Sequence, residues 1–348
     1  MGTSYLVKSQ KQFQKKRVLI LHTGGTIGMG LPEPPHTNQP LSPDHGFVKT
    51  LKKTVPELWA LASIDVRALF NKDSSLMTPK DWVAIADSII AGNDDYDAFV
   101  VTHGTDSMVY AGPALSFLLP YPCKPVILTG SQRPLAEIRT DARRNLINAV
   151  ALATTQRVCE VCVFFDNVLL RANRTKKVHI EDYHTFDSPN FTPLAEEGMK
   201  TKFHVQTREA LNRPTLEPLF DSRIQIVKVF PGIDPKLVPT VRAVVVEAFG
   251  CGNLPMVESS VLGFIKSCRR KKIPVILTSQ VQAGALAPEI YDMGRRALEL
   301  GAISSRDMTF EATMIKCMML AGNNVSYEDW PTGITSNWAG EITPVPRF

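Results

Sequence analysis

The sequence predicts an α/β protein with a larger N-terminal parallel-sheet domain, flanked by helices, and a smaller C-terminal α/β domain. Its 348 residues exceed what one ordinary hydrophobic core organises. Apolar strand-like runs alternate with helix-like stretches through the first two-thirds of the chain. This alternation breaks at a polar stretch containing Pro214 and Pro218, and then resumes. We therefore predict an N-terminal domain over residues 1–205, a linker over 206–222 and a C-terminal domain over 223–348.

In the first domain, strands are predicted where short apolar runs lie between turn residues. Helices are predicted between these strands, and one begins at Thr78-Pro-Lys-Asp81, where Thr is a helix cap and Pro fits the first turn. Alternation of this kind favours parallel strands covered by helices on both faces. The predicted strands are 18–21, 64–69, 98–102, 125–129 and 161–165, and the two further helices are 108–119 and 141–154.

The second domain repeats the alternation over a shorter length. Three apolar runs predict strands, and two longer segments predict helices. The predicted strands are 224–229, 243–246 and 274–278, and the helices are 257–268 and 308–320.

Composition and charge exclude several classes of function. Apolar residues make up 44% of the chain and charged residues 21%, as in a soluble globular protein. The net charge is only +5, and the basic run Arg269-Arg-Lys-Lys272 has no interleaved aromatic residues, so nucleic acid is not an expected partner. No run has the length or apolarity of a signal peptide or membrane span. We expect a cytoplasmic protein that binds neither nucleic acid nor membrane.

The cysteine pattern predicts no metal site. Six cysteines are scattered along the chain. Cys159 and Cys162 form a CxxC, but they lie in the strand-like run 158–165, where residues three apart face opposite sides. We therefore expect buried free thiols in a reducing compartment.

Two threonine-containing turns carry the first chemical signal. The strand at 18–21 runs into His22-Thr-Gly-Gly-Thr26-Ile-Gly, and the strand at 98–102 runs into His103-Gly-Thr105-Asp106. Such turns project hydroxyls at the carboxyl edge of a sheet, where open α/β folds bind ligands. Glycines let the backbone come close to a ligand. Two hydroxyls beside a carboxylate indicate acyl transfer rather than phosphate binding.

Each of these residues also has a purely structural interpretation. Thr26 could cap a helix, and Asp106 could be a first-turn acid that complements the helix dipole. Asp73-Ser-Ser could be a plain turn, and Lys177 could be a solvated lysine in a basic stretch. His22 and His103 are interpreted as structural.

Five motifs follow one another along the chain: Thr23-Gly-Gly-Thr26-Ile-Gly-Met, Asp73-Ser-Ser, His103-Gly-Thr-Asp106, Thr129-Gly-Ser-Gln and Asn173-Arg-Thr-Lys-Lys177. In order and spacing they resemble the bacterial-type L-asparaginases, and the stretch 98–148 is most similar to the type I, cytoplasmic branch. A second-domain signature has a counterpart in Phe249-Gly-Cys-Gly-Asn253-Leu-Pro. Five motifs in register make a shared site more probable than five separate structural explanations.

The resemblance implies hydrolysis of L-asparagine to L-aspartate and ammonia, with no metal or organic cofactor. It implies that Thr26 is the nucleophile that forms an acyl-enzyme. Thr105, Asp106 and Lys177 then form a Thr–Lys–Asp set in which Lys177 accepts the proton, and backbone N–H groups near Thr105 stabilise the oxyanion.

The resemblance also implies how the substrate is held and how the chain assembles. Asp73 and Ser74 match positions that bind the α-ammonium and α-carboxylate, and Asp106 shares the ammonium. Gly25 and Gly104 border the same site. Asn253 would reach a neighbouring subunit's site in a homodimer or in a homotetramer built from dimers.

Two departures from the family pattern stand out. The family has a tyrosine in the loop after the first turn, but no tyrosine lies between Gly28 and Phe47. Some type I members bind asparagine at an effector site, which we expect to be altered or absent here because Lys176 precedes Lys177 and residues 277–281 contain no cysteine. Candidate replacements for the tyrosine are His36, Thr37, Ser42, His45 and Tyr183.

Three alternative functions remain open. One methylene separates asparagine from glutamine, so a glutaminase, or an amidase domain serving a tRNA-dependent transferase, is the nearest rival. An amino-acid sensor that has lost turnover would account for the missing tyrosine. A nucleotide-binding protein is disfavoured, because Thr-Gly-Gly-Thr-Ile-Gly matches no phosphate-loop spacing.

Overall fold

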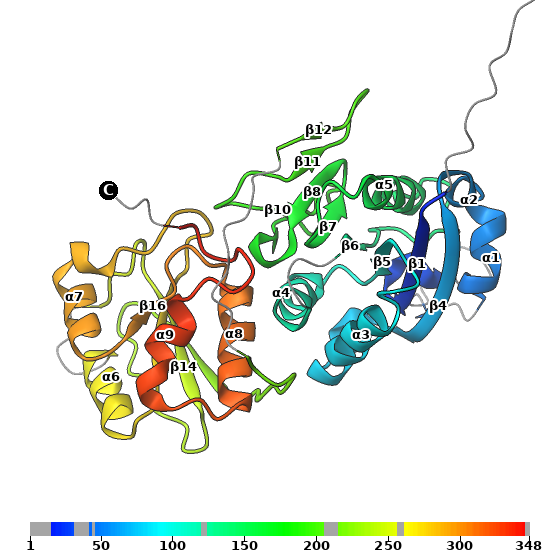
Figure 1. The fold of residues 1–348 in the computed structure, drawn as a ribbon. Coiled ribbons are helices and arrows are strands. Elements are labelled where there is room, and N and C mark those ends of the chain that lie inside the picture. The colour runs from blue at the N-terminus through cyan, green and yellow to red at the C-terminus, as the bar shows by residue number, and fades with distance from the viewer. Residues whose placement is uncertain are drawn as a thin grey trace, which may run out of the picture.

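The computed structural model describes residues 15–30, 42–43, 46–119, 124–204, 215–255 and 261–344. Two α/β units lie side by side, with the N-terminal strands and helices on one side and the C-terminal ones on the other (Figure 1). The N-terminal unit contains an eight-stranded sheet and the C-terminal unit a four-stranded one. The predicted fold class, a larger domain followed by a smaller one, is confirmed.

The larger sheet has the strand order β12-β11-β8-β7-β6-β5-β1-β4. Strands β4, β1, β5, β6 and β7 are parallel, whereas β8 returns antiparallel to β7 and β11 pairs antiparallel with β8 and β12. The antiparallel edge is an addition to the predicted parallel sheet. The strands are β1 Arg17–Gly24, β4 Ser63–Lys72, β5 Ala98–Thr102, β6 Val126–Thr129, β7 Val161–Phe165, β8 Val168–Arg171, β11 Ala195–Glu196 and β12 Lys202–Phe203.

Helices cover both faces of this sheet, because successive buried residues of β1 belong alternately to two hydrophobic cores. Val18 and Ile20 belong to one hydrophobic core, which includes residues of α1, α2 and α5. Leu19 and Leu21 belong to the other core, which includes residues of α3 and α4. Successive strand side chains point to opposite faces, so one strand supplies both cores. The helices are α1 Phe47–Thr54, α2 Glu57–Leu61, α3 Pro79–Ala91, α4 Met108–Leu118 and α5 Ala142–Thr155.

The C-terminal sheet is parallel, in the order β13-β14-β15-β16. Its helix α8 packs against α4 of the first domain, and one hydrophobic cluster continues from that sheet into the core around α4. The two domains therefore share buried apolar surface. The elements are β13 Ile224–Lys228, β14 Ala243–Ala248, α6 Val261–Arg270, β15 Val275–Ser279, α7 Asp292–Glu299, β16 Ile303–Ser304, α8 Phe310–Gly322 and α9 Trp330–Thr335.

Two small pairings lie outside the main sheets. The strand β2 (Met29–Gly30) pairs with β3 (Ser42–Pro43), and β9 (Lys176–Lys177) pairs with β10 (Phe186–Asp187). The first pairing begins directly after the first threonine turn, and the second contains Lys176 and Lys177.

Several local predictions need correction. The helices α1, α2, α7 and α9 were not predicted. The predicted linker lies partly outside the described residues, as do the first residues of the helix predicted at 257–268. Cys159 precedes β7 and is exposed, and Cys251 is partly exposed, so the expectation of buried thiols is wrong for these two, whereas Cys162, Cys268 and Cys317 are buried.

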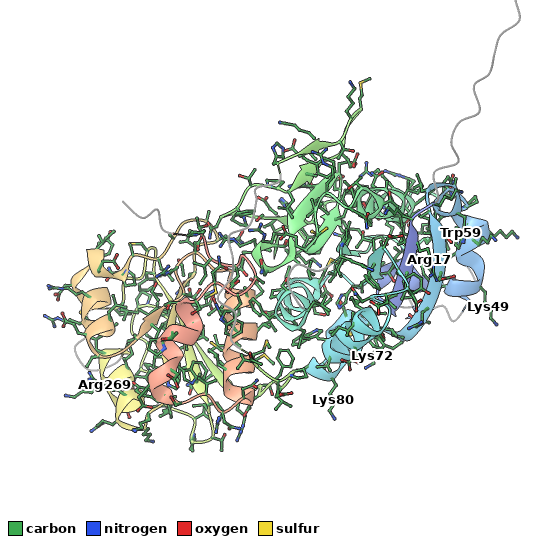
Figure 2. The ribbon with its side chains drawn as sticks, viewed as in Figure 1. Arg17, Lys49, Trp59, Lys72, Lys80 and Arg269 are labelled. Carbon is green, nitrogen blue, oxygen red and sulfur yellow. The ribbon has the colours of Figure 1, made fainter. Side chains whose placement is uncertain are left out.

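We next looked among the described residues for a basic patch, a metal-binding cluster and a membrane-spanning helix. Arg17 and Arg269 lie on opposite sides of the molecule (Figure 2), so the basic run that begins at Arg269 is not continued by Arg17. No cluster of three or more His, Cys, Asp or Glu side chains suited to a metal ion occurs among the described residues. None of the helices in the described ranges is long and apolar enough to cross a bilayer.

Candidate active site at the carboxyl edge of the larger sheet

Three adjacent parallel strands end at the same edge of the sheet. The order β5-β1-β4 places the turn after β1 between the turns after the other two strands. Thr26 follows β1, Asp73 and Ser74 follow β4, and Thr105 and Asp106 follow β5. The topology therefore brings together residues that are up to 80 positions apart in the sequence.

Two glycines let these turns touch. Gly25 has φ +81°, and a Cβ built on it would lie 2.3 Å from the Gly104 nitrogen. A Cβ on Gly104 would lie 2.6 Å from Oγ of Ser74. Any side chain at either position would separate the turns, because the backbone of Gly104 fills the space beside Gly25 and the side chain of Ser74 fills the space beside Gly104. The Gly25 amide also donates to the carbonyl of Lys72, 2.9 Å away.

Lys177 reaches this edge from β9. Its Nζ lies 2.9 Å from Oγ1 of Thr105 and 2.7 Å from Oδ1 of Asp106. Thr105 is buried, the Lys177 side chain is 21% exposed and the Asp106 side chain is 68% exposed. The structure thus brings together three of the four predicted catalytic residues in one hydrogen-bonded set, open to solvent on the carboxylate side.

The structural interpretations of Thr26 and Asp106 do not describe their geometry. Thr26 is the first residue of the 3-10 helix Thr26–Gly28, whose N-cap is Gly25, and it is half-buried. Asp106 precedes Ser107, the N-cap of α4, so it lies outside that helix's first turn. Neither residue is therefore used as the helix cap or first-turn acid that the alternative supposed.

Asp73, in contrast, does have the structural role that the alternative gives it, because its side chain stabilises its own turn. Its Oδ1 accepts hydrogen bonds from the backbone and hydroxyl of Ser75, at 2.8 and 2.7 Å, and it caps the 3-10 helix Ser74–Leu76. The hydroxyl of Ser107 donates to the carbonyl of Ser74, 2.5 Å away. Sequence reasoning missed Ser107, which joins the turn after β4 to the turn after β5; only its position next to Asp106 could have suggested it.

Buried side chains at the ends of β1 and β5 support the two threonine turns. Nδ1 of His22 lies 2.8 Å from Oγ1 of Thr102, and the hydroxyl of Thr23 donates to the Thr102 carbonyl at 2.7 Å. These contacts tie the end of β1 to the end of β5. His103 is fully buried, and burial lowers its pKa, so the ring is neutral at pH 7. This geometry fits a structural role for both histidines.

Other residues singled out from the sequence lie elsewhere or outside the described ranges. Asn253 hydrogen-bonds within its own turn, to Phe249 and Leu254, in the C-terminal domain. The hydroxyl of Tyr183 donates to the carbonyl of Arg139, 3.0 Å away. Ser42 lies in β3, paired with Gly30. The remaining candidates for the missing tyrosine, His36, Thr37 and His45, lie outside the described residues.

The fold and this edge define a class: a two-domain α/β protein that presents threonine hydroxyls, a lysine amine and a carboxylate at one sheet edge. Two family models match the chain. "Asparaginase, N-terminal" matches residues 17–211, and "Glutaminase/Asparaginase C-terminal domain" matches residues 223–331. The chain therefore belongs to the asparaginase family.

Individual relatives agree with this assignment. L-asparaginase 1 of Escherichia coli K12 is 36% identical over 95% of this chain and 99% of its own length. The solved structure of the thermostable L-asparaginase from Thermococcus kodakarensis superposes with a TM-score of 0.84 at 31% identity, covering 94% of this chain and 100% of that one. A glutamyl-tRNA(Gln) amidotransferase component of Pyrococcus horikoshii is 33% identical over 95% of this chain, but over only 78% of its own length.

Proposed function

We propose that this protein hydrolyses L-asparagine to L-aspartate and ammonia through a threonine-linked acyl-enzyme. One observation supports this proposal most strongly. The Lys177 amine contacts both Thr105 and Asp106, at the sheet edge where the turn bearing Thr26 also lies. An amide is a poor electrophile, so its hydrolysis needs an activated hydroxyl, a proton acceptor and oxyanion donors.

In the first half-reaction, Oγ1 of Thr26 attacks the side-chain carboxamide carbon. The hydroxyl proton passes to the amide nitrogen, which leaves as ammonia, and an ester forms between Thr26 and the aspartyl group. Backbone N–H groups near Thr105 hold the negative charge that develops on the carboxamide oxygen. Asp73, Ser74 and Asp106 hold the substrate's α-ammonium and α-carboxylate.

In the second half-reaction, a water molecule attacks the ester. Lys177 acts with Thr105 as the proton acceptor, and Asp106 keeps the amine oriented toward the hydroxyl. Cleavage of the ester returns the proton to Oγ1 of Thr26 and releases L-aspartate. Hydroxyls, an amine and backbone donors supply every group in this scheme, so the proposal includes no cofactor.

Assembly and location form part of the same proposal. Asn253 bonds only within its own turn in the described part of the chain, which leaves its amide available to a neighbouring subunit. We propose a homodimer or a homotetramer of dimers in which Asn253 approaches the partner's site. Similarity to the structure of a probable cytoplasmic L-asparaginase from Campylobacter jejuni supports a cytoplasmic enzyme.

The similarity to an amidotransferase component favours one second candidate, an amidase that takes glutamine. The test measures ammonia release from L-asparagine and from L-glutamine, using wild type, Thr26→Ala and the control Thr154→Ala in α5. Release from asparagine that is lost only in Thr26→Ala supports the proposal. Faster release from glutamine favours the second candidate. No release from either amide, with asparagine still raising the melting temperature, contradicts hydrolysis and indicates a sensor.

A further inference from the structure

The segment that carries Lys177 is held by the C-terminal domain. We call residues 171–177 the lysine segment and residues 339–343 the C-terminal segment. Arg171 donates to the carbonyl of Gly340 at 3.3 Å, and Asn173 donates to the carbonyl of Ala339 at 2.9 Å. Two side chains of the lysine segment thus meet a single stretch of backbone in the C-terminal segment.

Arg174 forms the centre of this contact. Its side chain is 1% exposed and donates to Oδ2 of Asp307 at 2.8 Å and to the carbonyl of Glu341 at 2.7 Å. It also donates to the Asp307 carbonyl and to the hydroxyl of Thr343. One guanidinium therefore joins the lysine segment to the turn before α8 and to the C-terminal segment.

The C-terminal segment is itself fixed to α8. Lys316 of α8 is fully buried and donates to Oε1 of Glu341 at 2.6 Å. The carboxylate of Glu341 in turn accepts the backbone N–H groups of Trp338 and Ala339, at 2.8 and 2.7 Å. A buried ion pair with both partners hydrogen-bonded is costly to rearrange, so this segment is a rigid support.

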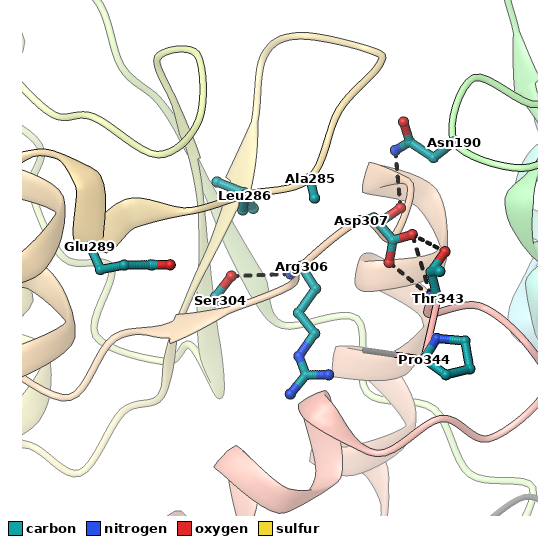
Figure 3. A pocket seen from close by; sticks show the side chains of 9 residues that line it. All are labelled: Asn190, Ala285, Leu286, Glu289, Ser304, Arg306, Asp307, Thr343 and Pro344. Carbon is teal, nitrogen blue, oxygen red and sulfur yellow. Dashed lines mark hydrogen bonds between the residues drawn. The ribbon is translucent and has the colours of Figure 1, made fainter. Parts of the chain in front are cut away.

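Asp307 completes the support. Its carboxylate accepts the backbone N–H of Thr343 at 3.0 Å and the Thr343 hydroxyl, as the dashed lines in Figure 3 show. Asp307 also forms part of the wall of a cavity of about 620 Å³ that Asn190 and Arg306 line as well. Truncation of the side chain at position 307 would therefore enlarge an existing cavity.

The opposite side of the lysine segment lies against α4. A Cβ on Gly112 of α4 would come within 2.9 Å of Cβ of Ala172, so the two elements are in close contact. Lys176 extends the hold on the C-terminal side through an ion pair with Glu311 of α8, 3.0 Å long. The next residue, Lys177, turns toward Thr105 and Asp106.

We propose that Arg174 and Asp307 are positioning residues for Lys177: the C-terminal domain, through this pair, sets where the lysine amine lies relative to Thr105 and Asp106. The inference rests on the proposed function of Lys177. It adds that the reactive set of the first domain depends on an ion pair across the domain boundary. A displacement of about 1 Å can slow a catalytic step about 100-fold, so loss of this support should lower kcat.

The test compares Asp307→Asn and Asp307→Ala with the same two substitutions at Asp221. Asp221 is a matched control, since it lies in the polypeptide that leads into the C-terminal sheet and its largely buried carboxylate bonds Arg223. Melting temperature, kcat and KM for asparagine are measured for each folded variant. In parallel, the rate at which acetic anhydride labels Lys177 is measured by peptide mass spectrometry, with no need for turnover.

We expect Asp307→Ala to lower kcat by about 10- to 100-fold while KM changes by less than about twofold, and to increase Lys177 labelling several-fold. Asp307→Asn keeps an acceptor oxygen, so its loss in kcat and its gain in Lys177 labelling should both be smaller than those of Asp307→Ala. The Asp221 variants should have a lower melting temperature but unchanged kcat and unchanged Lys177 labelling. Unchanged kcat and labelling in folded Asp307→Ala would overturn the inference. If wild type releases no ammonia, the proposed function fails, and the labelling rates alone decide whether Asp307 positions Lys177.

Discussion

The Nζ of Lys177 lies 2.7 Å from Oδ1 of Asp106, although the two residues are 71 positions apart. The same nitrogen is 2.9 Å from Oγ1 of Thr105. One amine therefore bridges a buried hydroxyl and an exposed carboxylate. The contact exists only because β9 returns to the carboxyl edge of the sheet after the chain has made its antiparallel hairpin, so this set is a product of the fold.

Lys177→Met should remove the proton acceptor and leave the substrate site intact. We expect kcat for asparagine hydrolysis to fall by about 10²–10⁴-fold, the usual contribution of general acid–base catalysis. L-Aspartate should still raise the melting temperature of the variant, since Asp73 and Ser74 are untouched. The control is Lys202→Met on the edge strand β12, an exposed lysine whose loss should change neither quantity. Turnover within tenfold of wild type in Lys177→Met would remove Lys177 from the mechanism.

The contact between the turns predicts a steep sensitivity at one glycine. In Gly104→Ala the added Cβ would lie 2.6 Å from both Cβ and Oγ of Ser74, so the turns after β4 and β5 must separate. We expect hydrolysis to be lost and the protein to be destabilised by about 1–3 kcal/mol, as for other overpacked sites.

The control for this prediction is Gly263→Ala in α6, where nothing lies within 4 Å of the added Cβ. Alanine is the better helix former, so this variant should be stabilised by about 0.5–1 kcal/mol with activity unchanged. Urea unfolding and ammonia release measure both effects. Wild-type activity in Gly104→Ala would show that the turns after β4 and β5 need not touch.

Sequence reasoning predicted the strands that bear the site because each is a short apolar run that ends in a turn. Both threonine turns follow strands of the predicted parallel sheet, at 98–102 and directly after 18–21. The antiparallel strands β8, β11 and β12 were missed, since two- to four-residue strands carry too little periodicity to detect. The helices α1 and α2 were missed for a similar reason, being short and adjoining one another.

The support around Lys177 could not be predicted from the sequence alone. Arg174 lies inside a recognised motif, but the sequence does not show whether an arginine is buried or exposed to solvent. Its partners, Asp307 and Thr343, lie more than 130 residues away and in no motif. Pairing across a domain boundary depends on how α8 packs against α4, which no local pattern encodes.

The ion pair between Arg174 and Asp307 should also shape the stability of the protein in acid. Burial by itself raises the pKa of Asp307, but the hydrogen bond and charge of Arg174, with the bonds from Thr343, lower it below its ordinary value of 3.8. The folded state then binds fewer protons than the unfolded state as the pH drops below 3.8. The stabilisation from this carboxylate is therefore complete above that pH and is lost as the pH falls through the folded-state pKa.

Asp307→Asn removes this titration. We expect wild type to exceed the variant in unfolding free energy by a constant amount between about pH 5 and 7, and the difference to shrink as the pH is lowered below 4. Urea unfolding at a series of pH values, read by tryptophan fluorescence, measures it. Asp65→Asn is a control, because Asp65 is exposed on β4 and its carboxylate accepts a hydrogen bond from the hydroxyl of Tyr96. A difference between wild type and Asp307→Asn that stays constant down to the acid transition would show that the carboxylate is not held in its charged form by Arg174.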